Sequence, residues 1–215
     1  MIEVPEEGKY VVLLSGGLDS TTLLYYLRSL NYRVHALIVS YGQMHFKETL
    51  IASLLCKNLN QPYTLLRVSG LKTWTKVVEG EYTPENTKAM TVPFRNSIFL
   101  LHAANLAVSL GWRHVAYAAH KGDAPYPDCT AEYVYAMKTL LELAHHEPIT
   151  LEAPFLGATK GEIVQLGAKL GVPLERTWSC YKGGDKHCGK CPTCLERKKA
   201  FEEAGIDDLT EYEHV

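Results

Sequence analysis

Residues 9–27 read KYVVLLSGGLDSTTLLYYL, and they carry the strongest indication of the fold. Residues 9–14 form a short apolar run rich in valine and leucine, which predicts a buried strand. Leucines then recur at helical spacing, so a helix is expected over residues 18–30. Between the two elements, Gly16 and Gly17 allow a sharp turn and the close approach of a ligand to the backbone. A strand, a glycine loop and a helix in this order predict a binding site at the helix start.

The loop at residues 15–20, SGGLDS, is suited to a phosphate group. The first N–H groups of the following helix have no partner inside the helix, and the positive end of its dipole attracts an anion. Ser15, Ser20 and Thr21 add hydroxyl donors. The loop is neither the Walker motif, which requires Gly-Lys-Ser/Thr, nor the G-x-G-x-x-G dinucleotide fingerprint. The sequence therefore predicts a phosphate site of a different type.

Strand-like and helix-like segments continue to alternate as far as Pro154, which predicts a parallel sheet with helices on both faces. After Pro154 no strand is expected, and Thr159 with Glu162 forms a capping box that begins a helix ending before Gly171. We expect a nucleotide-binding domain over residues 1–155 and a small helical region over residues 156–215. The expected strands cover residues 9–14, 33–40, 63–68 and 114–119, and the expected helices cover residues 18–30, 47–59, 98–110, 131–144, 160–170 and 195–204.

Four cysteines, Cys180, Cys188, Cys191 and Cys194, lie within fifteen residues near the C-terminal end. Such crowding favours a metal site over disulfides, and the intervening glycines provide the turns that let the thiolates converge. Four thiolates predict a tetrahedral structural zinc site with no open position. An iron–sulfur cluster is the rival interpretation, because Cys-x2-Cys-x2-Cys also occurs in ferredoxins. The remaining Cys56 and Cys129 are expected to be small buried apolar residues.

Composition excludes several classes of function. The net charge of −2 gives no strong attraction to nucleic acid, so no stable nucleic-acid partner is expected. The basic run of Arg197, Lys198 and Lys199 is interpreted as a solvated helix face. No apolar run reaches the length of a membrane span and no signal peptide opens the chain, so we expect a cytoplasmic protein with no membrane partner.

Ser-Gly-Gly-x-Asp-Ser at residues 15–20 resembles the PP-loop of the N-type ATP pyrophosphatases, which adenylate a substrate and release pyrophosphate. Together with the cysteine cluster, the chain resembles the 7-cyano-7-deazaguanine synthase (QueC) family over nearly its whole length. The segments that carry this resemblance are Ser15–Ser20, Tyr41–His45, Val92–Asn96, Asp123 with Tyr126–Cys129, Thr177–Tyr181, Cys188–Cys194 and Arg197.

The resemblance implies a Rossmann-like fold of the adenine nucleotide alpha hydrolase type. It implies conversion of 7-carboxy-7-deazaguanine, ammonia and ATP to the 7-nitrile, zinc on the four cysteines, and a homodimer. Asp19 would hold Mg²⁺ or orient the phosphates. The expected ATP-binding residues are Leu14, Ser15, Gly16, Gly17, Leu18, Asp19, Ser20, Thr21, Tyr41, Gln43 and His45. Thr130 stands where many members of the family carry arginine after the Tyr-Pro-Asp-Cys run. This departure weakens the expectation for substrate contacts near that run.

Roles beyond the phosphate loop are hypotheses. Arg95 is expected to pair with the substrate carboxylate or the α-phosphate as a bidentate donor, and Asn96 to bind substrate beside it. Asp123 or Asp128 would accept hydrogen bonds from the aminopyrimidine edge, or would instead cap a helix. Tyr126 would stack on the deazapurine ring. Asp19, Arg95 and Asp123 are the expected catalytic residues.

Three other interpretations stay open. A relative of the synthase could act on a different acceptor, in DNA or protein modification. The part of its sequence that activates the substrate with ATP would look the same. A tRNA-thiolating PP-loop enzyme would need a persulfide-bearing cysteine or a cluster with an open iron, and usually an RNA-binding domain, for which the chain has neither the length nor the charge. A zinc-ribbon module that binds RNA or protein would leave the phosphate loop without a use.

Overall fold

The computed structural model describes residues 8–42, 47–71, 80, 83, 85, 87–88, 91–123 and 126–214. Within them the chain forms, in order, β1 (Lys9–Leu13), α1 (Leu18–Ser29), β2 (Arg33–Ser40), α2 (Lys47–Asn58), β3 (Tyr63–Arg67), α4 (Arg95–Ser109), β4 (His114–Ala116), η1 (Lys121–Asp123), η2 (Pro127–Cys129), α5 (Ala131–Leu143), β5 (Thr150–Glu152), α6 (Lys160–Lys169), η3 (Leu174–Arg176) and α7 (Pro192–Ala204). The three η elements are single turns of 3₁₀-helix.

The strands form one parallel sheet in the order β3-β2-β1-β4-β5. Val11 of β1 lies between His35 of β2 and Val115 of β4, and Val115 is paired in turn with Leu151 of β5. Strand order reverses between β1 and β4, and in open parallel sheets ligands bind in the crevice at such a point. The predicted fold class is confirmed.

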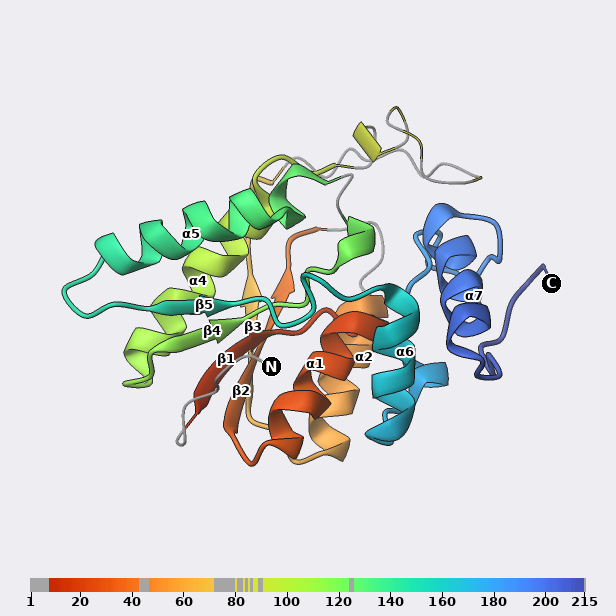
Figure 1. Ribbon diagram of the computed structural model, residues 1–215, viewed down its shortest axis with the longest axis horizontal. Coiled ribbons are helices and arrows are strands. Elements are labelled where there is room, and N and C mark those ends of the chain that lie inside the picture. The colour runs from red at the N-terminus through yellow and green to blue at the C-terminus, as the bar shows by residue number, and fades with distance from the viewer. Residues whose placement is uncertain are drawn as a thin grey trace.

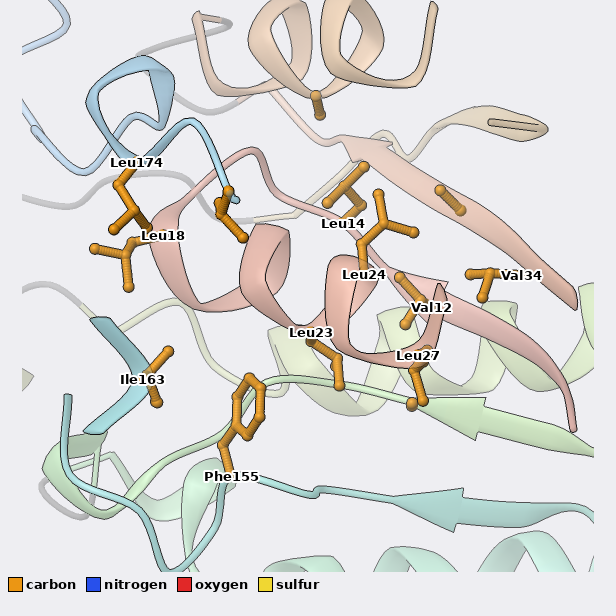
Figure 2. Close-up of a cluster of buried hydrophobic side chains, with 14 of the residues drawn as sticks. Val12, Leu14, Leu18, Leu23, Leu24, Leu27, Val34, Phe155, Ile163 and Leu174 are labelled. Carbon is orange, nitrogen blue, oxygen red and sulfur yellow. The ribbon is translucent and has the colours of Figure 1, made fainter. Parts of the chain in front are cut away.

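Alternation along the strands divides the core between the two faces of the sheet. Tyr10 and Val12 point into one buried cluster and Val11 into another, as the period of two along a strand requires. Figure 1 shows α1, α2 and α6 on one face of the sheet and α4 and α5 on the other. The first cluster, drawn in Figure 2, joins the leucines of α1 to Phe155, Ile163 and neighbouring residues.

The C-terminal helices share this core. Ile163 and Val164 of α6 and Phe201 of α7 belong to the same buried cluster as Val12 and Leu24. A single cluster that includes residues before and after 155 means that the C-terminal region packs against the sheet domain through apolar side chains. The division of the chain into domains at residue 155 remains a prediction.

Several element boundaries differ from the expected ones. The helix expected from residue 98 begins at Arg95, because Phe94 takes a left-handed conformation with φ of 58° and the Asp128 carboxylate accepts a hydrogen bond from the Asn96 N–H at 3.4 Å. The helix expected from residue 195 begins at Pro192, and proline at the first turn lacks the N–H that would have no partner there. The three-residue strand β5 was not predicted, since it is too short to show an apolar pattern.

The interpretation of residues 197–199 as a solvated face is wrong for Arg197. This side chain is fully buried, and its guanidinium donates to the Thr210 hydroxyl at 2.9 Å, the Thr177 hydroxyl at 2.9 Å and the Leu174 carbonyl at 2.6 Å. It also donates to Ser179 Oγ at 3.2 Å. Buried polar groups need hydrogen-bond partners, and this one arginine donates to acceptors of both the η3 turn and the C-terminal loop.

None of the helices that the structure describes combines the length and the apolar character that a bilayer span requires.

Candidate active site

A cleft of about 280 Å³ opens at the carboxyl ends of β1, β2 and β4, where the strand order reverses. Loops after three strands, the first turns of α1, α2 and α4, and the C-terminal region all contribute to its wall. Its lining residues are Leu13, Leu14, Ser15, Gly17, Leu18, Asp19, Ser20, Leu37, Val39, Tyr41, Glu48, Thr49, Arg95, Asn96, Phe99, Tyr117, Ala118, Ala119, Asp123, Tyr126, Cys129, Lys160, Trp178, Ser179, Tyr181, Thr193 and Glu196.

The phosphate loop is held by its own hydroxyls. Ser15 Oγ and Ser20 Oγ lie 2.9 Å apart, and each also accepts a hydrogen bond from a backbone N–H of the loop. Gly16 has φ of +86°, and a Cβ there would lie 2.6 Å from the Glu48 carbonyl oxygen of α2. Glycine is required at this position because the loop both turns in the left-handed region and packs on α2. The backbone N–H of Trp178, in the C-terminal region, donates a hydrogen bond to the Gly16 carbonyl of the loop at 2.9 Å.

A cluster of charged side chains lies beside the loop. Asp19, in the first turn of α1, is 3.3 Å from the Lys160 ammonium, and Lys160 is 2.7 Å from Glu196. His120 Nε2 lies 3.5 Å from Asp123 and 3.9 Å from Asp19. The His120 Nδ1 accepts a backbone hydrogen bond from the N–H two residues on, at 3.0 Å. A neutral His120 therefore carries its proton on Nε2, facing the two carboxylates.

Carboxylates outnumber the cations in this cluster. Burial raises the pKa of Asp123 to about 6, although His120 and Lys160 act in the opposite direction. Burial alone would lower the pKa of Lys160, but Asp19, Glu196 and Asp123 hold it above its usual range, so the amine is protonated. Among the described residues, Asp19 Oδ1 is a buried oxygen with no hydrogen-bond partner. A buried carboxylate oxygen without a partner beside a phosphate loop fits a site for a divalent cation that arrives with the phosphates.

Arg95 is another charged residue that lines the cleft. Its guanidinium donates to the Tyr41 hydroxyl at 3.3 Å, and α4 begins at this residue. Burial opposes the charge, but Tyr41, Tyr181 and Asp128 raise the pKa of Arg95 above its usual range. Glu48, in the first turn of α2, also lines the cleft, and burial raises its pKa to about 7 against the influence of Arg95.

Most of the predicted ligand-binding residues are brought together in this cleft. They are Leu14, Ser15, Gly17, Leu18, Asp19, Ser20, Tyr41, Arg95, Asn96, Asp123 and Tyr126. Gly16, Thr21 and Asp128 do not line it: Gly16 turns the loop, the Thr21 side chain is buried, and Asp128 holds the start of α4. Gln43 and His45 lie outside the described residues. Their roles in binding remain predictions.

Several lining residues were not assigned a role from the sequence. Trp178, Ser179 and Tyr181 were noted only as part of a family-like segment, while Lys160 and Glu196 were not singled out. Lys160 follows the capping residue Thr159, and Glu196 lies two residues after a cysteine of the cluster. No local pattern indicates that these two side chains meet, because they are brought together by helix packing.

The four cysteines Cys180, Cys188, Cys191 and Cys194 form one buried cluster, with all four sulfur atoms within 4.8 Å of one another. Cys188 Sγ and Cys194 Sγ lie 3.9 Å apart. Four thiolates at a Zn–S distance of about 2.3 Å around one tetrahedral ion are separated by about 3.8 Å. In a cubane iron–sulfur cluster each cysteine binds a different iron, which requires a wider spacing. The geometry fits a single ion.

Backbone N–H groups point at the sulfur atoms. Cys180 Sγ accepts from the N–H of Lys182 and of Cys188, and Cys188 Sγ accepts from the N–H of Cys191, each at 3.3 Å. Such donors stabilise thiolate charge, which a metal ligand requires.

The cluster also builds one wall of the cleft. Trp178, Ser179 and Tyr181 are within two residues of Cys180, and Thr193 and Glu196 are within two residues of Cys194. An ion that fixes the cysteines therefore fixes these five lining residues as well.

Residues 9–205 match the family model described as "Queuosine biosynthesis protein QueC". The chain belongs to the QueC family. Its curated relatives include proteins named 7-cyano-7-deazaguanine synthase from Caldicellulosiruptor bescii, 46% identical over 94% of this chain and 96% of the relative, and from Methanoregula boonei, 44% identical over 95% and 99%. The family expected from the sequence motifs is confirmed, and these QueC relatives are named as synthases.

Solved structures show the fold of this QueC chain in other enzymes. An NMN synthetase from Francisella tularensis aligns with a TM-score of 0.53 at 13% identity, covering 94% of this chain and 79% of that chain. A 4-thiouridine synthetase, solved with RNA and bound ATP, aligns with a TM-score of 0.53 at 18% identity, covering 92% of this chain and 50% of the other. At these identities the likeness shows the fold alone.

Proposed function

We propose that this QueC protein converts 7-carboxy-7-deazaguanine and ammonia to 7-cyano-7-deazaguanine at the expense of ATP. The observation that carries the proposal is that the loop at residues 15–20 and the Arg95 side chain line one cleft. The names of the relatives support the substrate and product, since synthases of this name are more than 40% identical over nearly the full chain.

The chemistry requires two activations of the same carbon. A carboxylate is a poor electrophile, so its oxygen first attacks the α-phosphate of ATP and pyrophosphate leaves. Ammonia attacks the resulting acyl-adenylate and expels AMP to give the amide. The amide oxygen then attacks a second ATP, and loss of a proton and AMP from the adenylated amide leaves the nitrile. One cleft with one phosphate loop serves both rounds.

The loop side of the cleft holds the triphosphate in this proposal. Loop N–H groups, the start of α1 and the hydroxyls of Ser15 and Ser20 would bind the phosphates. Asp19 fits a Mg²⁺ ion, which would supply charge neutralisation of the phosphates when bound. Asp19 itself would orient the ion through its Oδ1 atom.

Other residues that line the cleft hold the deazaguanine in this proposal. Arg95 would bind the substrate carboxylate or the α-phosphate, and Tyr126 would stack on the ring. Asp123 would accept hydrogen bonds from the aminopyrimidine edge, and Asn96 would bind substrate beside Arg95. The four cysteines would hold a structural Zn²⁺ ion with no open coordination position.

The alternative function, sulfur transfer by a tRNA-thiolating enzyme, has less support. Cys129 is the cysteine that lines the cleft outside the metal cluster, and burial raises its pKa far above the usual value. A thiol held in the neutral form is a poor nucleophile.

The test is incubation of the purified protein with ATP, Mg²⁺, ammonium and 7-carboxy-7-deazaguanine, followed by mass spectrometry of the small molecules. We expect the nitrile with transient amide and AMP, no nitrile when ammonium is omitted, and at least about 100-fold slower AMP release by Asp19→Asn. AMP formation without nitrile would contradict the acceptor and favour a different modification pathway. Intact ATP after incubation with substrate and metal-replete protein would contradict the proposal as a whole.

A further inference from the structure

Among the residues that the structure describes, four carboxylic acids line the cleft, and they differ in their partners. Asp19 and Glu196 both form ion pairs with the Lys160 ammonium. Asp123 accepts a hydrogen bond from a backbone N–H at 3.3 Å. The fourth is Glu48, in the first turn of α2, and no described group forms a hydrogen bond or an ion pair with its carboxylate. This carboxylate is therefore free to interact with a ligand in the cleft.

Glu48 is close to both the phosphate loop and Arg95. A Cβ at Gly16 would lie 2.6 Å from the Glu48 carbonyl oxygen, so the first turn of α2 packs directly on the loop. The Arg95 guanidinium is near enough to lower the pKa of the Glu48 carboxyl, against the larger effect of burial. In the proposed function Arg95 binds the substrate carboxylate or the α-phosphate to which it becomes bonded. Glu48 thus lies near the carbon that would react with ammonia.

The reaction at that carbon releases protons from nitrogen. Ammonia is mostly ammonium at neutral pH, and ammonium has no lone pair with which to attack. A second proton leaves the nitrogen once it is bonded to the carbon, and the amide loses its N–H protons on the way to the nitrile. Both rounds therefore need a group in the cleft that accepts protons.

Other side chains of the cleft are poorly suited to that task. None of the histidines that the structure describes lines the cleft. Burial raises the pKa of Tyr117 and of Cys129 far above their usual values, so both keep their protons. The neighbouring carboxylates hold the pKa of Lys160 above its usual range, so its amine is already protonated. Burial raises the pKa of Glu48 to about 7, which lets one group accept and release protons near neutral pH.

We propose that Glu48 is the catalytic base that accepts protons from nitrogen in both rounds of the reaction. The inference rests on the proposed function. In the first round the Glu48 carboxylate takes a proton from ammonium and passes it to water. The nitrogen lone pair then forms the C–N bond, Glu48 takes a second proton from that nitrogen, and the bond from carbon to the adenylate oxygen breaks with its electron pair passing to AMP.

In the second round Glu48 takes both N–H protons of the adenylated amide in turn. The electron pair of the second N–H bond completes the carbon–nitrogen triple bond as AMP leaves. Adenylation itself releases no proton from nitrogen, because the substrate oxygen attacks the α-phosphate and pyrophosphate leaves. Loss of Glu48 should therefore spare the first adenylation and slow the nitrogen steps. A residue that only supported the phosphate loop would affect adenylation as well.

The test compares wild type with Glu48→Gln, Glu48→Ala and the control Glu202→Gln, an exposed residue of α7. Exchange of labelled pyrophosphate into ATP, with 7-carboxy-7-deazaguanine present and ammonium absent, measures adenylation alone. Mass spectrometry after rapid quenching measures amide formation with ammonium. We expect both Glu48 variants to keep exchange within about 3-fold of wild type and to form amide at least about 100-fold more slowly, with no change in the control. Thermal melting checks that each variant is folded.

Chemical rescue separates a base from a structural residue. Formate can enter the space left by Glu48→Ala and accept the proton, so it should speed amide formation by that variant at least about 10-fold and leave wild type unchanged. Hydroxylamine is largely neutral at neutral pH and needs no proton removed before it attacks. It should therefore outpace ammonium by a larger factor in Glu48→Gln than in wild type.

Two results would overturn this inference alone. One is folded Glu48 variants that form amide at the wild-type rate. The other is folded variants in which exchange and amide formation fall together and formate restores neither. A wild-type protein that shows no exchange in the presence of 7-carboxy-7-deazaguanine would overturn the proposed function as well.

Discussion

At the scale of single residues, Arg197 gives the clearest prediction about stability. It is fully buried and donates to four acceptors of η3, its flanking residues and the C-terminal loop. Arg197→Met removes the charged donor from the hydroxyls of Thr210, Thr177 and Ser179 and should lower the free energy of unfolding by about 3 to 5 kcal/mol. Urea unfolding measures the change. The matched control is Lys199→Met, an exposed neighbour expected to change stability by less than about 0.5 kcal/mol; equal effects of the two would contradict the burial of Arg197.

The raised pKa of Glu48 predicts that the free energy of unfolding depends on pH. Burial raises its pKa from 4.5 to about 7 in the folded protein. Between these two values the folded state binds more protons than the unfolded state, so this group makes stability fall as the pH rises. Between pH 5.5 and pH 8, urea unfolding should show Glu48→Gln gaining about 2 kcal/mol of stability relative to wild type. A difference between the two proteins that does not vary with pH would show that Glu48 ionises normally.

Some residues of the candidate site could be predicted from the sequence, and others could not. The phosphate loop and the four cysteines were found because their chemistry depends on spacing within a few residues of one another. Lys160 and Glu196 contact Asp19 and each other across three helices, and nothing in their local sequence encodes that meeting. Arg197 was misinterpreted for the same reason, since its acceptors lie in other segments of the chain.

At the scale of elements, the left-handed backbone at Phe94 predicts that glycine is more stable than alanine at this position. Phe94 precedes α4 with φ of 58° and is 76% exposed, so the ring contributes little packing while the backbone occupies the left-handed region. Phe94→Gly should be more stable than Phe94→Ala by about 1 kcal/mol, the reverse of their order inside a helix. Both variants lose the ring, so urea unfolding of the pair isolates the backbone effect. Alanine equal to or better than glycine would show that the left-handed turn is absent.

Long elements could be predicted from sequence and short ones could not. Helices such as α1 and α5 were placed to within about two residues, because apolar periodicity spans several turns. The strand β5 has three residues and only Leu151 fully buried, which is too little pattern to distinguish it from a loop. The start of α4 depends on Asp128 from a distant turn, so it could not be found from the helix sequence.

At the scale of the whole molecule, we expect metal binding at the cysteine cluster to affect the shape of the cleft. Purified protein should contain one zinc ion per chain by elemental analysis. Removal of the ion by a chelator should lower the Tm by at least about 10 °C and abolish ATP binding, because lining residues flank the ligands. Zinc should restore both. A metal-free protein with unchanged Tm and unchanged ATP affinity would contradict this coupling.

Double activation of one carbon by ATP can be tested with 7-carboxy-7-deazaguanine that carries ¹⁸O in both carboxylate oxygens. Each adenylation transfers one substrate oxygen to AMP, so we expect the AMP from both rounds to carry one ¹⁸O atom while unlabelled nitrile accumulates. Mass spectrometry of AMP and product reads the result. AMP without ¹⁸O would mean that water attacked the α-phosphate, and the claim of substrate adenylation would be contradicted.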